Sequence, residues 1–306
     1  MAGRERRLMT DTVALIGLGT IGEGWGLAFA SAGHPLRLHD ADTTRAMQAA
    51  ERIGREVAGA RVEVRADLAE AVAGVAHVQE SIAETIDAKT ALFAELGRLA
   101  PPSAVLASSS SALLPSAIFA GLDGAERALV AHPFNPPHVM RAVEIVPSPR
   151  TSEATIARAA DLLSGIGQVP LVVRKEVPGY VMNRLQAAVV GEAMHLVAEG
   201  VVSPEELDRA FPAALGWRWG VMGPFETMDL NAEQGFEAYV DRFGASYQQL
   251  TRTLCVDAPW TPEAVAAVAE ARRRAVPRAA LQERRRWRDR MVRAVAALTA
   301  GRGARG

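Results

Sequence analysis

The sequence predicts an α/β protein, in which a doubly wound parallel sheet is followed by an all-helical region. Three observations lead to this fold class. Short β-rich runs alternate with helical patterns from residue 12 to about residue 148, a glycine-rich turn closes the first of these runs, and the β-rich runs stop after Pro178-Gly179. Alternating β and α segments at this spacing favour parallel strands joined by crossover helices.

The predicted elements of the first region follow in order. Apolar or alternating runs predict strands at residues 13–16, 36–40, 75–78, 104–107, 128–131, 143–146 and 169–173. Amphipathic patterns predict helices at residues 22–31, 43–57, 87–100 and 151–164.

Pro178-Gly179 is the predicted domain boundary, because this pair interrupts regular structure. Beyond it, helical patterns occur at residues 180–199, 204–214, 226–242, 262–274 and 278–299. We therefore expect a flexible N-terminus at 1–10, a dinucleotide-binding domain at 11–177, a helical substrate and dimerisation domain at 178–300, and a disordered tail at 301–306.

Composition excludes several functional classes. The 306 residues are 49% apolar with a formal net charge of −1, which indicates a globular protein without a global field for nucleic acid or an anionic membrane. The single cysteine, Cys255, excludes an internal disulfide framework and a Cys-rich metal site. No apolar run approaches the ~18 residues that a membrane span needs. We expect a cytoplasmic enzyme with no bound metal.

The turn Gly17-Leu18-Gly19-Thr20-Ile21-Gly22 has the spacing of a dinucleotide-binding loop. The first glycine permits a tight turn, the second admits a pyrophosphate, and the third allows close helix packing. Asp40 ends the next predicted strand, where a carboxylate would bind the ribose hydroxyls of NAD and repel the extra phosphate of NADP. This Rossmann-type pattern predicts NAD as the cofactor, with Ile21 among the contacts. The alternative for Asp40 is a helix N-cap, since Thr43 and Thr44 follow.

Four polar residues could carry the chemistry: Ser111, His132, Glu144 and Asn183. His132 enters a Pro-rich turn, and histidine titrates near neutrality, as a base for alcohol oxidation must. Glu144 lies in an apolar strand, where an unpaired carboxylate is costly to bury, so a partner such as His132 is expected. Equally, Glu144 could face solvent from an edge strand and His132 could be a structural turn residue. Composition alone places Ser111 at a helix entry and Asn183 on a helix surface.

Four separated motifs resemble, in order, those of the 3-hydroxyacyl-CoA dehydrogenase family. They are the glycine turn with Asp40, the run Ser108 to Ser111, His132-Pro133-Phe134-Asn135-Pro136-Pro137 with Glu144, and Pro178-Gly179-Tyr180-Val181-Met182-Asn183-Arg184. Within the family, Ala112-Leu113-Leu114-Pro115-Ser116 and Gly223-Pro224-Phe225-Glu226-Thr227-Met228 are most similar to the lambda-crystallin and L-gulonate 3-dehydrogenase branch.

The resemblance implies roles for individual residues. His132 would be the base and Glu144 its partner, while Ser111 and Asn183 would hydrogen-bond the substrate oxygen. Glu84 and Lys89 match the family's pair beside the nicotinamide ribose; from the residues alone they would be a solvated pair at a helix start.

The chain departs from the acyl-CoA members in two places. The segment between Asp40 and Glu84 is short and contains no lysine, leaving five arginines as phosphate partners, which puts CoA binding in doubt. Arg218, between Trp217 and Trp219, is a candidate clamp for a substrate carboxylate, because a guanidinium matches a carboxylate bidentately. Alternatively, Arg218 lies at a subunit surface. Asn135 is a second candidate substrate contact.

The resemblance thus implies an NAD-dependent dehydrogenase acting at the 3-hydroxyl of a small hydroxy acid, with L-gulonate as the lead substrate. The alternatives are a 3-hydroxyacyl thioester, on CoA or a carrier protein, and a crystallin-like structural protein with a vestigial site. The arginine-rich C-terminal segment has apolar residues at helical spacing, which favours packing on the protein itself or on a second subunit over nucleic-acid binding. A homodimer through the helical domain is expected.

Overall fold

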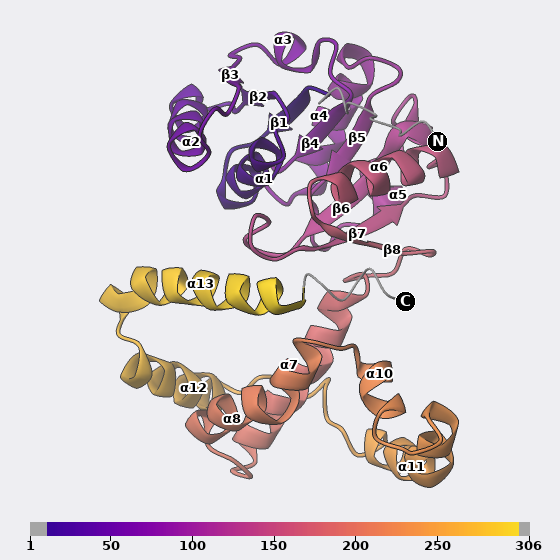
Figure 1. Cartoon of the computed structure of the whole chain (residues 1–306), viewed down its shortest axis with the longest axis vertical. Helices are drawn as coiled ribbons and strands as arrows, with labels where there is room; N and C mark the ends of the chain where they lie inside the picture. The colour runs from indigo at the N-terminus through magenta and orange to yellow at the C-terminus, as the bar shows by residue number, and fades with distance from the viewer. Residues whose placement is uncertain (1–10, 300–306) are drawn as a thin grey trace, which may run out of the picture. The chain divides into compact units, whose positions relative to one another are not determined.

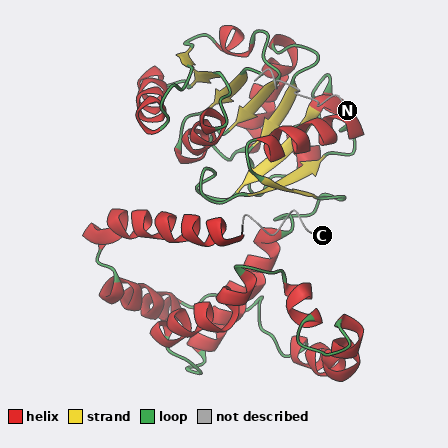
Figure 2. Cartoon of the chain, viewed as in Figure 1, coloured by secondary structure: helices red, strands yellow, loops and turns green. Residues whose placement is uncertain are grey.

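The computed structural model describes residues 11–299, and the chain forms two compact units, Met1–Met182 and Asn183–Gly306 (Figure 1). The expected flexible N-terminus and disordered tail lie outside the described residues. The first unit combines strands and helices, whereas the second contains helices only among its described residues (Figure 2). The predicted fold class, an α/β sheet followed by a helical region, is confirmed.

The first unit is built on one eight-stranded sheet with the order β3-β2-β1-β4-β5-β6-β7-β8. All neighbouring strands run parallel except β6 and β7, which are antiparallel. The strands are β1 Val13–Ile16, β2 Leu36–His39, β3 Val62–Val64, β4 His77–Glu80, β5 Val105–Ser108, β6 Ala128–Pro133, β7 Ala142–Pro147 and β8 Val169–Val172.

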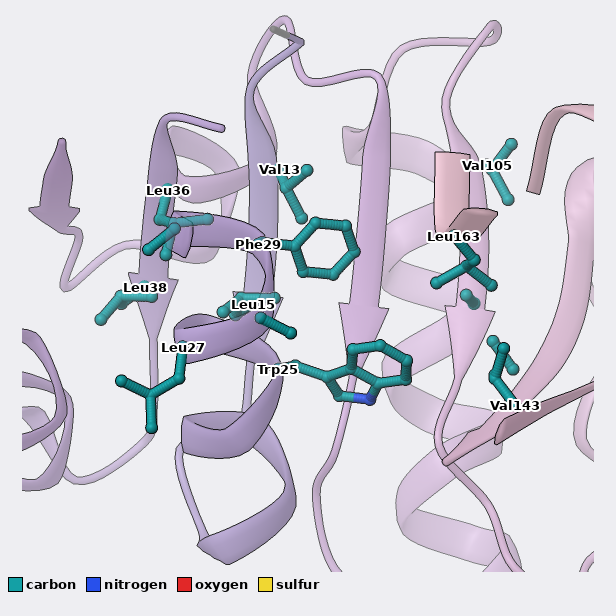
Figure 3. Close-up of a cluster of buried hydrophobic side chains, with 14 of the residues drawn as sticks. Val13, Leu15, Trp25, Leu27, Phe29, Leu36, Leu38, Val105, Val143 and Leu163 are labelled. Carbon is teal, nitrogen blue, oxygen red and sulfur yellow. The ribbon is translucent and has the colours of Figure 1, made fainter. Parts of the chain in front are cut away.

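Helices cover both faces of this sheet, so its central strands are buried on both sides. Val13 and Leu15 of β1 join one apolar cluster and Ala14 and Ile16 join the other, as the two-residue period of a strand requires. Figure 3 shows Trp25 and Phe29 packing in the first cluster. The helical elements are α1 Thr20–Ser31, α2 Thr43–Glu56, α3 Leu68–Val72, α4 Ile86–Leu99, α5 Pro115–Ile118, η1 Ala125–Arg127 and α6 Glu153–Gly165.

Three details of the sheet differ from the sequence-based expectation. The short strand β3 was not predicted, because its alternating residues Val62, Glu63 and Val64 make only a three-residue pattern at the sheet edge. Pairing in β4 begins at His77, two residues after the predicted start. Strand β6 continues through His132 to Pro133, so His132 lies in a strand and not in the following turn.

The second unit begins with the long helix α7 and continues through short and long helices. These are α7 Met182–Ala198, α8 Pro204–Phe211, η2 Pro212–Gly216, α9 Trp217–Trp219, α10 Pro224–Asp229, α11 Phe236–Thr251, α12 Pro262–Ala275, η3 Arg278–Ala280 and α13 Leu281–Thr299. Among the described residues, no helix is long and apolar enough to cross a membrane.

The predicted single helix over residues 226–242 is wrong. Helix α10 ends at Asp229, and Gly235, whose φ of 84° is incompatible with a helix, lies directly before α11. The Asp229 carboxylate accepts the backbone N–H of Phe236 at 2.8 Å and so satisfies a donor at the start of α11. The prediction failed because the helical spacing of apolar residues in the sequence continues through the segment before α11 in which the backbone is not helical.

Candidate active site

His132 and Glu144 face each other across the antiparallel strands β6 and β7. They are directly opposed in the register of this pair, and His132 Nδ1 lies 2.8 Å from Glu144 Oε2. His132 is 4% exposed and Glu144 is 0% exposed, which excludes a solvent-facing Glu144. Because a carboxylate accepts, His132 Nδ1 carries the proton, and in the neutral imidazole the lone pair therefore lies on Nε2. This is the protonation state that a general base needs.

The second oxygen of Glu144 is also occupied. Oε1 accepts the backbone N–H groups of Val181 at 2.8 Å and Met182 at 3.0 Å. Burial opposes ionisation of Glu144, but the hydrogen bonds from His132, Met182 and Val181 outweigh it and hold the pKa of Glu144 below its ordinary value. Glu144 therefore stays ionised near neutral pH and can stabilise a protonated His132.

Two aromatic rings surround the imidazole of His132. Their centroids lie 5.1 Å away for Phe134 and 5.5 Å away for Tyr180. Tyr180 is fully buried, has φ 51°, and donates its hydroxyl to the Leu113 carbonyl at 2.6 Å. These contacts hold a non-glycine residue in a left-handed conformation that costs energy. Burial raises the pKa of Tyr180, so its hydroxyl remains a donor.

The glycine turn has the geometry that its spacing predicts. Gly17 has φ 88°, and a Cβ at Gly22 would lie 1.9 Å from the Gly17 carbonyl oxygen, so neither position accepts a side chain. A Cβ at Gly19 would meet no atom within 4 Å, which leaves space for a ligand to approach the backbone. Gly19 precedes α1 without a side-chain cap, so the first N–H groups of α1 are available to an anion. Ile21, in the first turn of α1, packs against the core.

A pocket of about 550 Å³ adjoins this turn, and Asp40 lines it. One Asp40 oxygen accepts the N–H of Leu18 at 2.7 Å, and the other accepts the N–H of Asp42 at 2.9 Å. Arg45 Nη1 lies 3.3 Å from the same second oxygen. Asp42, not Asp40, caps α2, so the N-cap alternative for Asp40 is wrong. The turn, the pocket and the carboxylate together fit a dinucleotide.

Glu84 and Lys89 are not a solvated pair. The Lys89 side chain is 1% exposed, and its ammonium lies 2.6 Å from Glu80 and 3.4 Å from Glu84. Burial opposes ionisation of Glu84, but the Ser110 hydroxyl, Lys89 and the N–H groups of Ala112 and Ser111 outweigh it, so the pKa of Glu84 is lowered. Glu84 thereby ties α4 to the serine run after β5.

The structure places the other predicted residues as follows. Ser111 is exposed after β5, outside any helix, and its N–H donates to Glu84 at 2.8 Å. Asn135 is exposed after β6 and precedes a cis peptide bond. Asn183 and Arg218 belong to the second unit, where the Arg218 guanidinium donates to the Ala214 carbonyl. The partners of His132 and Glu144 described above belong to the first unit.

Sequence reasoning missed the Glu80 carboxylate. It is fully buried, pairs with Lys89, and accepts the Ser108 hydroxyl and the Ile82 N–H, each at 2.6 Å. A carboxylate in a buried strand was the criterion that singled out Glu144, and the same criterion identifies Glu80. Among the described residues no cluster of His, Cys, Asp or Glu could hold a metal ion.

Comparison with known protein families covers most of the chain. Residues 12–177 match the NAD binding domain of 3-hydroxyacyl-CoA dehydrogenase, and residues 179–270 match the C-terminal domain of the same enzyme. The chain belongs to the 3-hydroxyacyl-CoA dehydrogenase family. It is an NAD-dependent dehydrogenase that acts on a CH–OH group.

Individual relatives lie in several branches of this family. The chain is 38% identical to lambda-crystallin of Oryctolagus cuniculus, over 94% of this chain and 95% of that one. It is 36% identical to L-carnitine dehydrogenase of Burkholderia mallei, over 82% and 79%. A solved structure of 5-formyl-3-hydroxy-2-methylpyridine 4-carboxylic acid 5-dehydrogenase superposes with a TM-score of 0.75 at 26% identity, covering 96% of this chain and 100% of that one.

Proposed function

We propose that this dehydrogenase oxidises the 3-hydroxyl of a small hydroxy acid, with L-gulonate, converted to 3-dehydro-L-gulonate, as the lead substrate. The observation that carries the chemistry is the buried His132–Glu144 pair, whose 2.8 Å hydrogen bond directs the Nε2 lone pair of a neutral His132 away from the carboxylate. The lambda-crystallin relative, aligned over nearly its whole length, supports the branch from which the substrate is taken.

NAD, when bound, supplies the acceptor for the hydride that leaves the substrate carbon. His132 Nε2 takes the hydroxyl proton as the carbonyl forms, and the Glu144 carboxylate stabilises the resulting imidazolium. Ser111 and Asn183 hydrogen-bond the oxygen on which the carbonyl develops. The residues that would hold the dinucleotide are Gly17, Gly19, Ile21, Gly22, Asp40, Glu84 and Lys89.

The arginines between Asp40 and Glu84 support a free acid over a CoA thioester. Four of the five already contact groups of this chain: Arg45 contacts Asp40, Arg52 contacts Glu23 and Glu56, Arg61 donates to Gly33, and Arg65 pairs with Glu63. A CoA phosphate in this region would have to compete with these contacts. In a free acid the carboxylate is the anchor instead, and we propose Arg218 and Asn135 for its recognition.

The relatives named L-carnitine dehydrogenase give a second candidate substrate. L-carnitine is also a small 3-hydroxy acid, but it carries a cationic group that L-gulonate lacks. The test measures NAD reduction with L-gulonate, L-carnitine and 3-hydroxybutyryl-CoA. We expect turnover with L-gulonate, and we expect His132→Gln to lower kcat about 10²- to 10⁴-fold without changing the Kd for NADH.

Turnover with the CoA ester alone would overturn the free-acid proposal. Turnover with L-carnitine alone would replace the lead substrate. The absence of turnover with all three compounds would overturn the proposed substrate class. Arg218→Ala tests the carboxylate clamp: the KM for the acid should rise about 10-fold or more, since a charge-assisted bidentate contact is worth ~1.5–3 kcal/mol. An unchanged KM would reject the clamp.

We also propose that the protein is a cytoplasmic homodimer associating through its helical unit. Large apolar side chains are exposed on α7 of this unit, among them Leu185, Val189 and Val190. Apolar side chains grouped on one helix are typical of a face that packs on a partner. The free thiol of Cys255 is consistent with a reducing compartment.

A further inference from the structure

A chain of buried and half-buried polar side chains runs along β4 toward the glycine turn. His77, Gln79 and Ser81 alternate along this strand and its end, so they point to the same face of the sheet. Trp25 of α1 and Ser109, which follows β5, complete the chain on that face. None of these residues has a role in the proton transfer described above.

The direction of the first hydrogen bonds is fixed by atom type. The Trp25 indole N–H can only donate, and it lies 3.1 Å from Ser109 Oγ. The Gln79 amide nitrogen lies 3.4 Å from the Ala131 carbonyl, which can only accept, so the amide nitrogen faces this side. The same nitrogen donates to Ser109 Oγ at 2.8 Å, while Gln79 Oε1 faces His77 Nε2 at 3.1 Å.

Ser109 therefore accepts two hydrogen bonds, from Trp25 and from Gln79. A hydroxyl oxygen has two lone pairs, and both are used. The remaining partner of Ser109 is Ser81 Oγ at 2.9 Å, so Ser109 must donate its own proton to Ser81. This assignment leaves the Ser81 hydroxyl proton without an acceptor among residues 11–299.

Ser81 stands at the wall of the dinucleotide pocket. Ser81 lines this pocket together with Gly17, Gly19 and Asp40. A Cβ at Gly22 would lie 3.5 Å from the Ser81 Cβ, and a Cβ at Gly17 would lie 2.8 Å from the Ser81 carbonyl oxygen. Ser81 is thus adjacent to both glycines that shape the phosphate-binding turn.

We propose that Ser81 is a further cofactor-binding residue, whose hydroxyl donates a hydrogen bond to a phosphate or ribose oxygen of the dinucleotide. The chain from Trp25 and Gln79 through Ser109 orients this donor. Trp25 and Gln79 occupy both lone pairs of Ser109, so Ser109 donates to Ser81, and the Ser81 proton is left to point toward the pocket. Accepting a hydrogen bond from Ser109 also polarises the Ser81 hydroxyl and strengthens it as a donor. The proposal requires NAD binding alone and is independent of the substrate.

The first test measures the Kd of NADH and of ADP-ribose by calorimetry with the Ser81→Ala variant. One hydrogen bond is worth ~0.5–1.5 kcal/mol, so both Kd values should rise about 2- to 10-fold. Ser31→Ala is the matched control: Ser31 is exposed at the end of α1 and lies outside the pocket, so both Kd values should stay unchanged. Unchanged Kd values for Ser81→Ala would overturn the proposal. A loss confined to NADH would reject the phosphate or ribose contact.

The second test addresses the orienting chain. Trp25→Phe frees one lone pair of Ser109, which allows the Ser81 proton to turn inward. We expect the Kd for NADH to rise about 2- to 4-fold, which is less than the loss of a whole hydrogen bond, because the Ser81 donor remains but is less well oriented. In the Ser81→Ala background the same Trp25→Phe change should have no further effect. Equal losses in both backgrounds would mean that Trp25 acts through packing alone and would overturn the chain; thermal unfolding confirms that each variant is folded.

Discussion

At the residue scale, Glu144 divides its two oxygens between two tasks. One orients His132, and the other accepts backbone N–H groups from Val181 and Met182. A glutamine at this position has a single acceptor oxygen. Because the two backbone groups can only donate, that oxygen turns toward them and the amide N–H₂ turns toward His132. The histidine then accepts at Nδ1 and carries its proton on Nε2, where it no longer acts as a base.

We therefore predict that Glu144→Gln lowers kcat about 10³-fold while the Kd for NADH is unchanged. Steady-state kinetics and calorimetry check the two values. The control is Glu95→Gln, an exposed carboxylate on α4, which should keep wild-type kcat. A Glu144→Gln enzyme with wild-type kcat would show that the orientation of His132 is not set by this carboxylate.

Asp40 and Arg45 together predict how cofactor choice can be changed. The carboxylate of Asp40 repels a 2′-phosphate, and the Arg45 guanidinium beside it could bind one. Asp40→Asn keeps an acceptor for the Leu18 N–H but removes the charge. We expect the ratio of NADPH to NADH affinity to rise about 10- to 100-fold, as measured by binding fluorescence. Adding Arg45→Ala should abolish that gain; a gain that persists would exclude Arg45 as the phosphate partner.

The sequence suggested the pairing of His132 with Glu144, because a carboxylate in an apolar strand requires a partner, but it left a solvent-facing Glu144 open until the structure showed both side chains buried and in contact. It was insufficient for Ser81. The direction of that hydroxyl depends on Trp25 and Ser109, which lie 84 residues apart and meet only in the folded chain. The N-cap alternative for Asp40 was wrong because Asp42 lies directly before Thr43 and its carboxylate accepts N–H groups in the first turn of α2.

At the element scale, periodicity located the buried strands well, and it failed where local backbone geometry decides the boundary. The alternation of apolar residues does not show where the hydrogen-bonded pairing of two strands ends. Strand β6 extends through His132 because β7 pairs with it there. The break at Gly235 is likewise a backbone feature that the apolar pattern does not record.

Strand β4 contains a histidine that should make stability depend on pH. His77 is buried, its Nδ1 has no hydrogen-bond partner among the described residues, and burial lowers its pKa from 6.5 to about 4. In the unfolded chain it binds a proton near pH 6.5, in the folded chain only near pH 4. The contribution of neutral, buried His77 to the free energy of unfolding is therefore fully present above pH 6.5. This contribution is lost as the pH falls from 6.5 toward 4.

We predict that the free energy of unfolding falls by up to about 3 kcal/mol across this interval. Urea unfolding at pH values from 7 to 4.5 measures it, above the range in which most carboxylates titrate. His77→Gln should flatten the curve between pH 6.5 and 4.5. A variant whose stability depends on pH as steeply as wild type would assign the effect to other groups.

At the scale of the whole molecule, the helical unit carries the proposed dimer contact. Leu185 on α7 is 56% exposed, so Leu185→Glu should leave folding intact and prevent association. We expect a wild-type mass of twice 32.5 kDa by light scattering and a mass of 32.5 kDa for the variant. Met47→Glu, on α2 of the first unit, should remain dimeric. A monomeric wild-type protein at micromolar concentration would refute the proposal.

The antiparallel pairing of β6 with β7 has a consequence for how this family can diversify. The contact within the proposed proton-transfer pair is encoded by strand register, while the backbone of Val181 and Met182 holds the second oxygen of Glu144. A slip of one residue would send His132 and Glu144 to opposite faces of the sheet, so the register is under strong constraint. Residues that contact neither His132 nor Glu144 are free of that constraint. Mutation can therefore change what is bound while the reaction itself is inherited intact.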